Sequence, residues 1–240
     1  MMRKIMTYFM ACSAMIMSSL AFAEDSPHEF SANVDLTTDY MYRGQSQTGN
    51  LPTVDGGLDY AHESGFYAGT WASGINFGGN VEIDFYGGYA GDLGATSIGY
   101  DVGVLYYYYP GQASGSDLDF IEPYLGLSHS FNDMVDAGVN FRYSPDWQAS
   151  SGDAFNVEGT IDISLPYGFT LSGLVAHQSV DDNAAWGTPD WMYYSAGLSK
   201  SFGPFDFGLT YHDTDLSNAE CFGGDNLCDG RAVFNISSSW

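Results

Sequence analysis

The chain has 240 residues, and its 30 aspartates and glutamates stand against six lysines and arginines, which gives a formal net charge of −24 at pH 7. So few cations cannot neutralise a phosphate backbone, and nucleic acid is therefore excluded as a partner. Aromatic residues make up 16% of the chain, glycine is abundant and no segment shows a helical repeat of apolar residues, so the composition predicts an all-β protein.

The first 23 residues have the features of a secretory signal peptide. Arg3 and Lys4 form a basic start, an apolar stretch follows, and Ala21, Phe22 and Ala23 form a small-x-small cleavage site. We therefore expect residues 1–23 to be removed and residues 24–240 to form the exported protein, whose formal charge falls from −24 to −26 with the loss of these two cations. No later stretch approaches the roughly 20 apolar residues that a membrane helix needs.

After the signal, segments in which apolar and polar residues alternate recur to the end of the chain. Such alternation is typical of a strand with one apolar and one polar face. The clearest segments are residues 28–43, 80–89, 96–109, 134–143, 155–165, 205–213 and 232–240, and weaker ones are 53–61, 66–76, 118–130, 169–178 and 191–201. They predict about twelve strands, each near the length of a tilted strand that spans a bilayer. The tyrosine run 106–109 at a strand end is interpreted as interfacial girdle.

Short and long connections alternate along the chain. The short ones are residues 62–65, 91–94, 131–133, 166–168 and 202–204, the long ones are 44–52, 110–117, 144–154, 180–190 and 214–230, and only 76–80 departs from the pattern. An even-stranded, antiparallel up-and-down barrel in the outer membrane of a Gram-negative cell has this layout, with short periplasmic turns and long outer loops. The sequence therefore predicts such a barrel over residues 24–240, with both termini in the periplasm.

The last segment alternates up to the final residue, Trp240. Because an open sheet edge in lipid leaves unpaired backbone groups, the last strand is expected to pair with the first. An aromatic end preceded by alternating apolar residues also resembles the signature by which the barrel assembly machinery recognises its substrates. Phe234, Ile236 and Trp240 are the expected assembly signal. Partners expected from this layout are outer-membrane lipid, the assembly machinery during biogenesis and small solutes.

Two stretches carry a family resemblance: LTTDYMYRGQSQT at residues 36–48 and GGLDYAHESGFYAGTWAS at residues 56–73. They resemble the opening of the TorF-type family of proposed porins, also catalogued as the Gcw_chp domain, and the resemblance covers essentially the whole exported chain. It implies an outer-membrane barrel of unsettled function, with no catalytic residues to carry over. It also implies a structural feature at the mouth of the first strand, formed by Asp39, Arg43 and Gly44.

Charged residues on the polar strand faces are the candidate pore lining. They are Asp35, Asp39, Arg43, Glu82, Asp84, Asp101, Glu122, Asp136, Arg142, Glu158, Asp162 and Asp206. In a water-filled pore these carboxylates would concentrate cations and repel anions, with Glu82 and Asp84 as the most sensitive pair. The alternative is a filled barrel whose acids only hydrogen-bond across the core. Arg43 is correspondingly either a constriction residue or one half of an ion pair in the lumen.

The sequence thus predicts a narrow outer-membrane channel for small cations or neutral solutes. A structural or adhesion-type barrel that is closed and acts through its outer loops is the alternative. A third interpretation, a lipid hydrolase, depends on two His-x-Ser segments, His62 to Ser64 and His177 to Ser179, and we expect no enzyme because such matches arise by chance in a serine-rich chain. No cofactor and no metal are expected. Cys221 and Cys228 are free to form a disulfide in an exported compartment.

Overall fold

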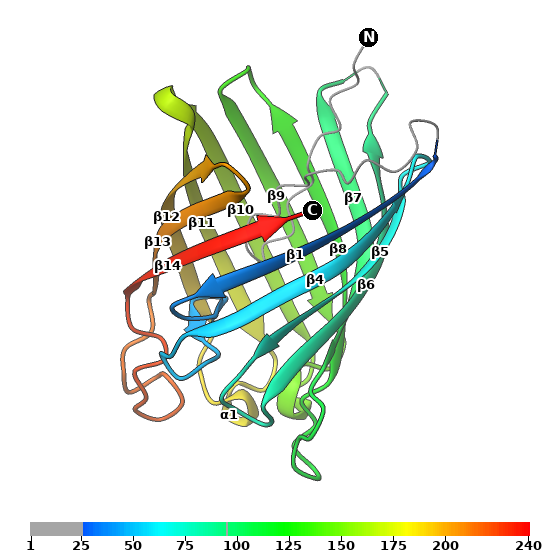
Figure 1. Ribbon diagram of the computed structural model, residues 1–240. Helices are drawn as coiled ribbons and strands as arrows, with labels where there is room; N and C mark the ends of the chain where they lie inside the picture. The colour runs from blue at the N-terminus through cyan, green and yellow to red at the C-terminus, as the bar shows by residue number, and fades with distance from the viewer. Residues whose placement is uncertain (1–25, 95) are drawn as a thin grey trace.

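The computed structural model describes residues 26–94 and 96–240, and this part of the chain forms a closed antiparallel barrel of twelve strands (Figure 1). The prediction of an all-β, up-and-down barrel is confirmed, because every barrel strand pairs with its neighbours in the sequence and the first pairs with the last. The expected signal peptide, residues 1–23, lies outside the described residues.

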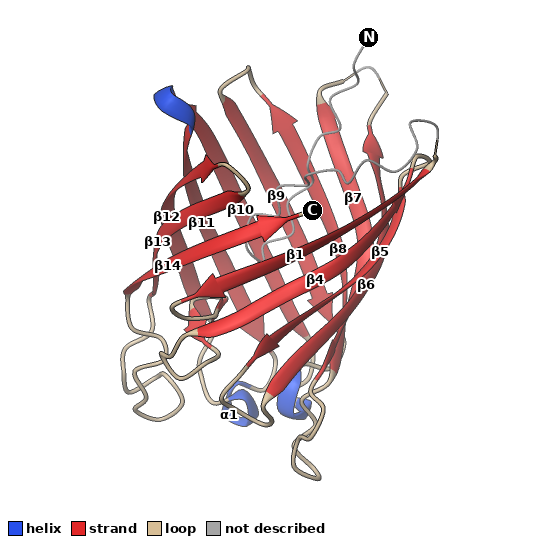
Figure 2. Cartoon of the chain, viewed as in Figure 1, coloured by secondary structure: helices blue, strands red, loops and turns tan. Residues whose placement is uncertain are grey.

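Figure 2 shows how little of the described chain is helical. Its one α-helical turn is α1 (Asn183–Trp186), and two 3-10 turns lie at Gln148–Ser150 and Pro166–Gly168. The barrel strands are β1 (His28–Thr37), β4 (Thr53–His62), β5 (Phe66–Gly74), β6 (Val81–Asp92), β7 (Ile98–Tyr108), β8 (Phe120–Ser130), β9 (Val135–Ser144), β10 (Ala154–Leu165), β11 (Phe169–Val180), β12 (Trp191–Phe202), β13 (Phe205–Thr214) and β14 (Arg231–Ser239), and the short strands β2 (Met41–Tyr42) and β3 (Gln45–Ser46) form a separate pair.

No helix within the described residues has both the length and the apolar character needed to cross a membrane.

The barrel closes between β1 and β14, and this pairing holds the chain terminus. In the register Leu36 lies opposite Ile236. One step beyond the strand end, the backbone N–H of Ala32 donates to the carbonyl of Trp240 at 2.9 Å, and the N–H of Trp240 donates to the carbonyl of Ala32 at 3.0 Å. The last residue is therefore part of the hydrogen-bond ladder, as expected because an open sheet edge in lipid would leave backbone groups unpaired.

Alternate residues of each strand face outward and inward. On β1, the side chains of Phe30 and Leu36 are 56% and 55% exposed, whereas that of Asp35, which points to the opposite face of the strand, is 4% exposed. Leu58 on β4 is likewise 62% exposed. Outward apolar side chains around a polar interior are the arrangement of a barrel that meets lipid on its outer face.

The connections separate by length at the two ends of the barrel. The turn end carries the five tight links, and the loop end carries the longer connections, including α1 (Figure 1). The connection 75–80 between β5 and β6 also lies at the loop end. This segment therefore departs from the alternation in length, as the sequence indicates, because it is a short connection at the loop end.

The first predicted strand, residues 28–43, ends early. β1 stops at Thr37, whose hydroxyl donates to the carbonyl of Asp39 at 2.8 Å, and the chain then turns into the barrel as the β2–β3 hairpin. Positive φ values at Arg43 (51°) and Gly44 (80°) make the turn of this hairpin. A continuous strand over residues 28–43 would place Tyr40 on the outward face with Phe30 and Leu36, but the hairpin buries Tyr40 inside the barrel. Local alternation does not distinguish a continuing strand from a strand that folds back.

Candidate functional site

The hairpin plug, which we define as residues 39–48, fills the loop end of the lumen. Its two strands pair Met41 with Ser46 and Tyr42 with Gln45, and every residue from 43 to 48 is buried. A β-carbon at Gly44 would lie 2.5 Å from the Cγ2 of Thr214, so the turn of the plug requires glycine both for its φ and for its close approach to the wall.

Asp39 holds the base of the plug together. Its Oδ1 accepts hydrogen bonds from the hydroxyls of Ser46 and Thr48, both at 2.6 Å. Its Oδ2 forms an ion pair with Arg231 at 3.1 Å. The carboxylate thus fixes the folded hairpin and joins it to the start of β14.

Arg43, at the tip of the plug, is bound on several sides. Its Nη2 donates to both carboxylate oxygens of Glu122, at 2.8 and 2.6 Å, and its Nη1 donates to Gln178. The indole of Trp191 donates to the carbonyl of Arg43 at 2.9 Å. The guanidinium carbon lies 4.6 Å from the centre of the Trp147 ring. Charge-assisted bonds and an aromatic face together offset the cost of burying this cation.

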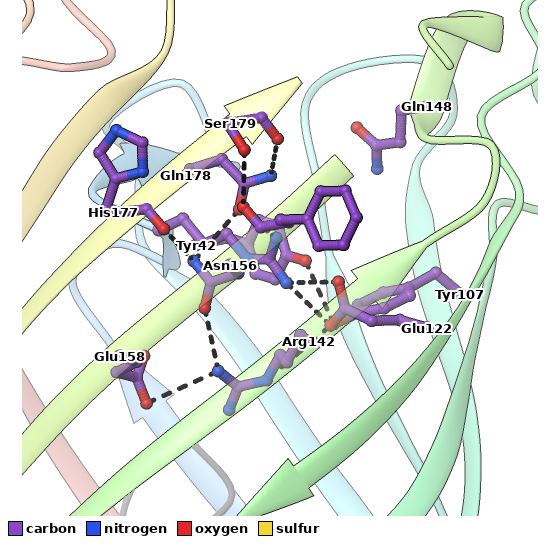
Figure 3. A network of polar contacts seen from close by, with 12 residues as sticks. Tyr42, Tyr107, Glu122, Arg142, Gln148, Asn156, Glu158, His177, Gln178 and Ser179 are labelled. Atoms are coloured by element: carbon purple, nitrogen blue, oxygen red, sulfur yellow. Dashed lines mark hydrogen bonds and ion pairs between the residues drawn. The ribbon is translucent and has the colours of Figure 1, made fainter. Parts of the chain in front are cut away.

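A second arginine extends the network across the wall. Arg142 lies 3.8 Å from Glu122 and 3.7 Å from Glu158, and it donates to Asn156 at 3.2 Å. Figure 3 shows these four residues around one another on neighbouring strands. Positive and negative groups alternate from Arg43 through Glu122 and Arg142 to Glu158, so each of these four buried charges has a partner of opposite sign.

Aromatic side chains pack around the plug at the loop end. Trp147 and Trp191 are each 1% exposed. The rings of Tyr107 and Phe120 stack with centroids 4.1 Å apart, and Phe120 lies 4.5 Å from Trp147. Tyr107 belongs to the run 106–109 that we interpreted as interfacial girdle, and that interpretation is wrong for Tyr107 and Tyr109 and stays a prediction for the other two. Tyr106 and Tyr108 face outward, while Tyr107 and Tyr109 face the lumen.

Tyrosines fill the side of the lumen formed by β4 to β8. The hydroxyl of Tyr67 donates to Asp101 at 2.5 Å, and that of Tyr86 donates to Asp59. On the plug, the hydroxyl of Tyr40 donates to Glu82 at 2.8 Å. These acids are therefore hydrogen-bonded within a packed half of the barrel.

A cavity of about 330 Å³ lies beneath the plug, lined mainly by β1 and β9 to β14 and on its other side by Asp55, Trp71 and Leu105. It extends from Tyr42 and Arg43 toward Gly168 and Lys200 at the turn end. Its titratable lining consists of the acids Asp35, Asp39, Asp55, Glu158, Asp162 and Asp206 with Arg43, Arg142, Lys200 and His212. Serine and threonine side chains form much of its remaining wall, at Thr160, Thr170, Ser172, Ser195, Ser199, Ser201, Thr210 and Ser237. The cavity is thus rich in hydroxyls and predominantly acidic, with apolar side chains such as Trp71, Leu105 and Leu174 completing its wall.

The candidate pore-lining residues all lie on the inner side of the barrel, but the structure divides them. Seven line the cavity: Asp35, Asp39, Arg43, Arg142, Glu158, Asp162 and Asp206. Glu82, Asp84, Asp101 and Glu122 are instead buried beside the plug and the tyrosines, so Glu82 and Asp84 are not the pair most exposed to the cavity. Asp136 lies near the turn end, where Ser130 donates to it.

The sequence did not predict several of the residues that form this site. Asp55 pairs with Asp35 across β1 and β4, but the glycines that follow it weaken the alternation of its segment. Trp147 and Gln178, which contact Arg43, come from a loop and from the end of β11. No local pattern brings these segments to the tip of a hairpin more than 100 residues earlier in the chain.

The two His-x-Ser segments lie outside the cavity. His62 and Ser64 are on an exposed turn, where Nδ1 of His62 lies 2.7 Å from the Ser64 hydroxyl and also accepts the backbone N–H of Ser64 at 3.2 Å. His177 is exposed, while the intervening Gln178 points inward (Figure 3). Within the described residues, no group of three or more histidines, cysteines or acids is placed to hold a metal ion.

Cys221 and Cys228 are joined by a disulfide in the loop 215–230 between β13 and β14, with Cα atoms 5.9 Å apart. In the same loop, the hydroxyl and the backbone N–H of Ser217 both donate to Glu220, which lowers the pKa of that carboxyl from its ordinary value. The loop therefore has internal bonds of its own, in addition to its contacts with the plug.

A family model described as "Bacterial protein of unknown function (Gcw_chp)" matches residues 21–240. The chain belongs to the Gcw_chp family. A comparison of this Gcw_chp chain with curated protein sequences finds no match.

Solved porin structures share the barrel fold of this Gcw_chp protein. A structure described as the KdgM porin in complex with disordered oligogalacturonate superposes with a TM-score of 0.61, covering 88% of this chain and 99% of that chain at 10% identity. The NanC porin superposes with a TM-score of 0.60, covering 86% and 98% at 15% identity. At such low identity the similarity establishes the fold and nothing finer.

Proposed function

We propose that this Gcw_chp protein is a narrow outer-membrane channel for small cations or neutral solutes, of the TorF type. The observation that carries the proposal is the acidic cavity of about 330 Å³ inside a closed barrel with an apolar outer face. The volume is near the lower end of the range for small-molecule pockets, roughly 300–1,000 Å³. The hairpin plug above the cavity restricts what can pass to small solutes.

The charge of the cavity favours cations. Six carboxylates line it against three basic side chains, those of Arg43, Arg142 and Lys200. Ion pairs join Asp39 to Arg231 and Glu158 to Arg142, which leaves Asp35, Asp55, Asp162 and Asp206 against Lys200, because Arg43 is paired with Glu122. The excess negative charge raises the local concentration of cations and repels anions. Oligogalacturonate, the polyanion in the KdgM structure, has the wrong charge for this lumen, so the shared fold does not imply a shared solute.

We expect the purified protein to conduct and to prefer cations. The measurement is the reversal potential of the protein in a planar bilayer with a KCl gradient. The preference should shrink with added salt, because the Debye length falls from about 10 Å at 0.1 M to about 3 Å at 1 M. A preference for anions would contradict the proposed lining, and a complete absence of conductance would favour a closed barrel.

The closed barrel is the second candidate function. The packed aromatic residues around the plug favour it, since Trp147 and Trp191 leave little free space at the loop end. In this case the protein would function in adhesion or as a structural component, through contacts made by its outer loops, which carry many carboxylates. Conductance separates the two candidates, because only the channel requires a continuous path for ions.

The proposed orientation places both termini and the tight turns in the periplasm. Epitope tags inserted near Asn50, Ser114, Ser150, Asn183 or Asn218 should then be accessible to antibody on intact cells. A tag between Glu63 and Ser64, in the β4–β5 turn, should be reached only after permeabilisation. If antibody labels the tag at this turn on intact cells and does not label the loop tags, the proposed orientation is wrong and the opposite one holds.

A further inference from the structure

The disulfide-containing loop contacts the hairpin plug directly. We call residues 215–230 the clamp loop. The carbonyl of Leu227 accepts the backbone N–H of Ser46 at 2.9 Å, and the side-chain amide of Asn50 donates to Asn226 at 2.9 Å. The clamp loop therefore adds a backbone hydrogen bond to the second strand of the plug, from outside the barrel ladder.

The disulfide lies beside the residues that make these contacts. Cys228 follows Leu227 immediately, and both cysteines are buried, at 0% exposure for Cys221 and 2% for Cys228. The carbonyl of Cys228 accepts the hydroxyl of Thr214 at 3.0 Å, and the N–H of Asp225 donates to the carbonyl of Cys221 at 2.8 Å. The position of the Leu227 carbonyl is thus fixed by a covalent link and two hydrogen bonds.

Arg231 joins the clamp loop to the base of the plug. Its Nη1 donates to Asp39 at 3.1 Å, its Nε donates to the carbonyl of Asp229 at 3.1 Å, and its Nη2 donates to the carbonyl of Asn226. Asp39 in turn closes the hairpin through Ser46 and Thr48. One side chain therefore connects β14, the clamp loop and the plug.

We propose that the disulfide-closed clamp loop is a device that holds the plug in the lumen and keeps the channel closed or narrow. The effect on conduction rests on the proposed channel function, whereas the stabilisation of the plug by the clamp loop does not depend on it. The barrel ladder is complete without the clamp loop, since β13 pairs with β14 directly. Loss of the disulfide therefore frees the clamp loop and the plug while the barrel remains assembled.

The test is hydrogen exchange of the plug, measured by mass spectrometry on peptides that cover residues 39–50 of the full protein in detergent. In the double variant Cys221→Ser/Cys228→Ser these amides should exchange roughly tenfold faster, as expected when one or two hydrogen bonds lose a fixed partner. Arg231→Gln, which leaves the disulfide intact, should change exchange in the same direction. Ser150→Ala, in a different outer loop, is the matched control and should leave exchange of the plug unchanged.

Conductance in planar bilayers gives the second measurement, and heat-modifiable migration in gels verifies that each variant is a folded barrel. Both clamp variants should conduct more than the parent protein. Unchanged exchange in two folded clamp variants would overturn the clamp. Faster exchange in both variants without conductance in any of them would support the clamp and refute the proposed channel, so the two failures are distinguishable.

Discussion

Replacing Arg43 by alanine should release the tip of the hairpin plug and raise single-channel conductance several-fold. At the tip of the plug, Arg43 contacts Glu122 and Gln178 of the barrel wall and the ring of Trp147. Its removal leaves the Glu122 carboxylate buried with only the more distant Arg142, 3.8 Å away, as a cation partner. Breaking a buried ion pair on one side costs about 3–5 kcal/mol, so the plug should lose its packed position even though the barrel ladder persists.

Two further variants separate the loss of the ion pair from a general loss of stability. Arg43→Ala/Glu122→Gln removes the unpaired carboxylate, so it should recover part of the thermal stability while conductance stays high. Arg43→Lys keeps the charge but loses the bidentate geometry, and it should lie between the parent and Arg43→Ala. A conductance for Arg43→Ala equal to that of the parent, in a protein with an intact barrel, would show that the plug does not obstruct the path.

The strand pattern carries most of the information about the fold. Alternation places Phe30 outside and Asp35 inside, and the lengths of the connections identify the two ends of the barrel. Both signals are local, because lipid and lumen impose opposite demands on consecutive side chains. The pairing of the terminal strand with β1 also follows from a general argument, since lipid does not tolerate an open sheet edge.

The plug could not be predicted in the same way, because long-range contacts stabilise it. The pattern of residues 36–42 is compatible with a continuing strand, and only the glycine at position 44 indicates a turn. What draws Arg43 inward is Glu122 on β8 and Gln178 on β11. A single sequence does not show that these residues converge, and the alternative we considered for Arg43, an ion pair in the lumen, named the type of partner but not its identity.

The division of the lumen into a filled half and a cavity was also beyond local reasoning. Parity shows that Asp101 and Asp162 both face inward, but it does not show that tyrosines occupy the space in front of Asp101. Tyr67 reaches Asp101 from two strands away. Near Asp162, by contrast, the neighbours are Ser172 and Thr160, which are too short to fill the lumen. The sizes of side chains on several strands, taken together, therefore decide where the free space lies.

Neutralising the cavity carboxylates should abolish most of the cation preference of the channel. The variant carries Asp35→Asn, Asp55→Asn, Asp162→Asn and Asp206→Asn, which keeps the shape of the lining while it removes four of the six carboxylates there. Asp39 and Glu158 stay unchanged because they hold the plug and Arg142. With fewer fixed negative charges the lumen concentrates cations less, so the reversal potential in a KCl gradient should move toward zero or change sign.

The matched control is Glu82→Gln/Asp84→Asn, which removes two inward-facing carboxylates that lie beside the plug and do not line the cavity. Its effect on the reversal potential should be smaller than that of Asp162→Asn/Asp206→Asn, a pair of equal charge, if ions pass through the cavity. The difference should be largest at low salt, because screening over about 10 Å at 0.1 M leaves only charges near the path effective. A larger effect of the Glu82 and Asp84 pair would instead place the path along the tyrosine-filled side, beside the plug. In that case the cavity would be a closed space, and cation preference would arise from carboxylates that are now bound within the packed half of the barrel.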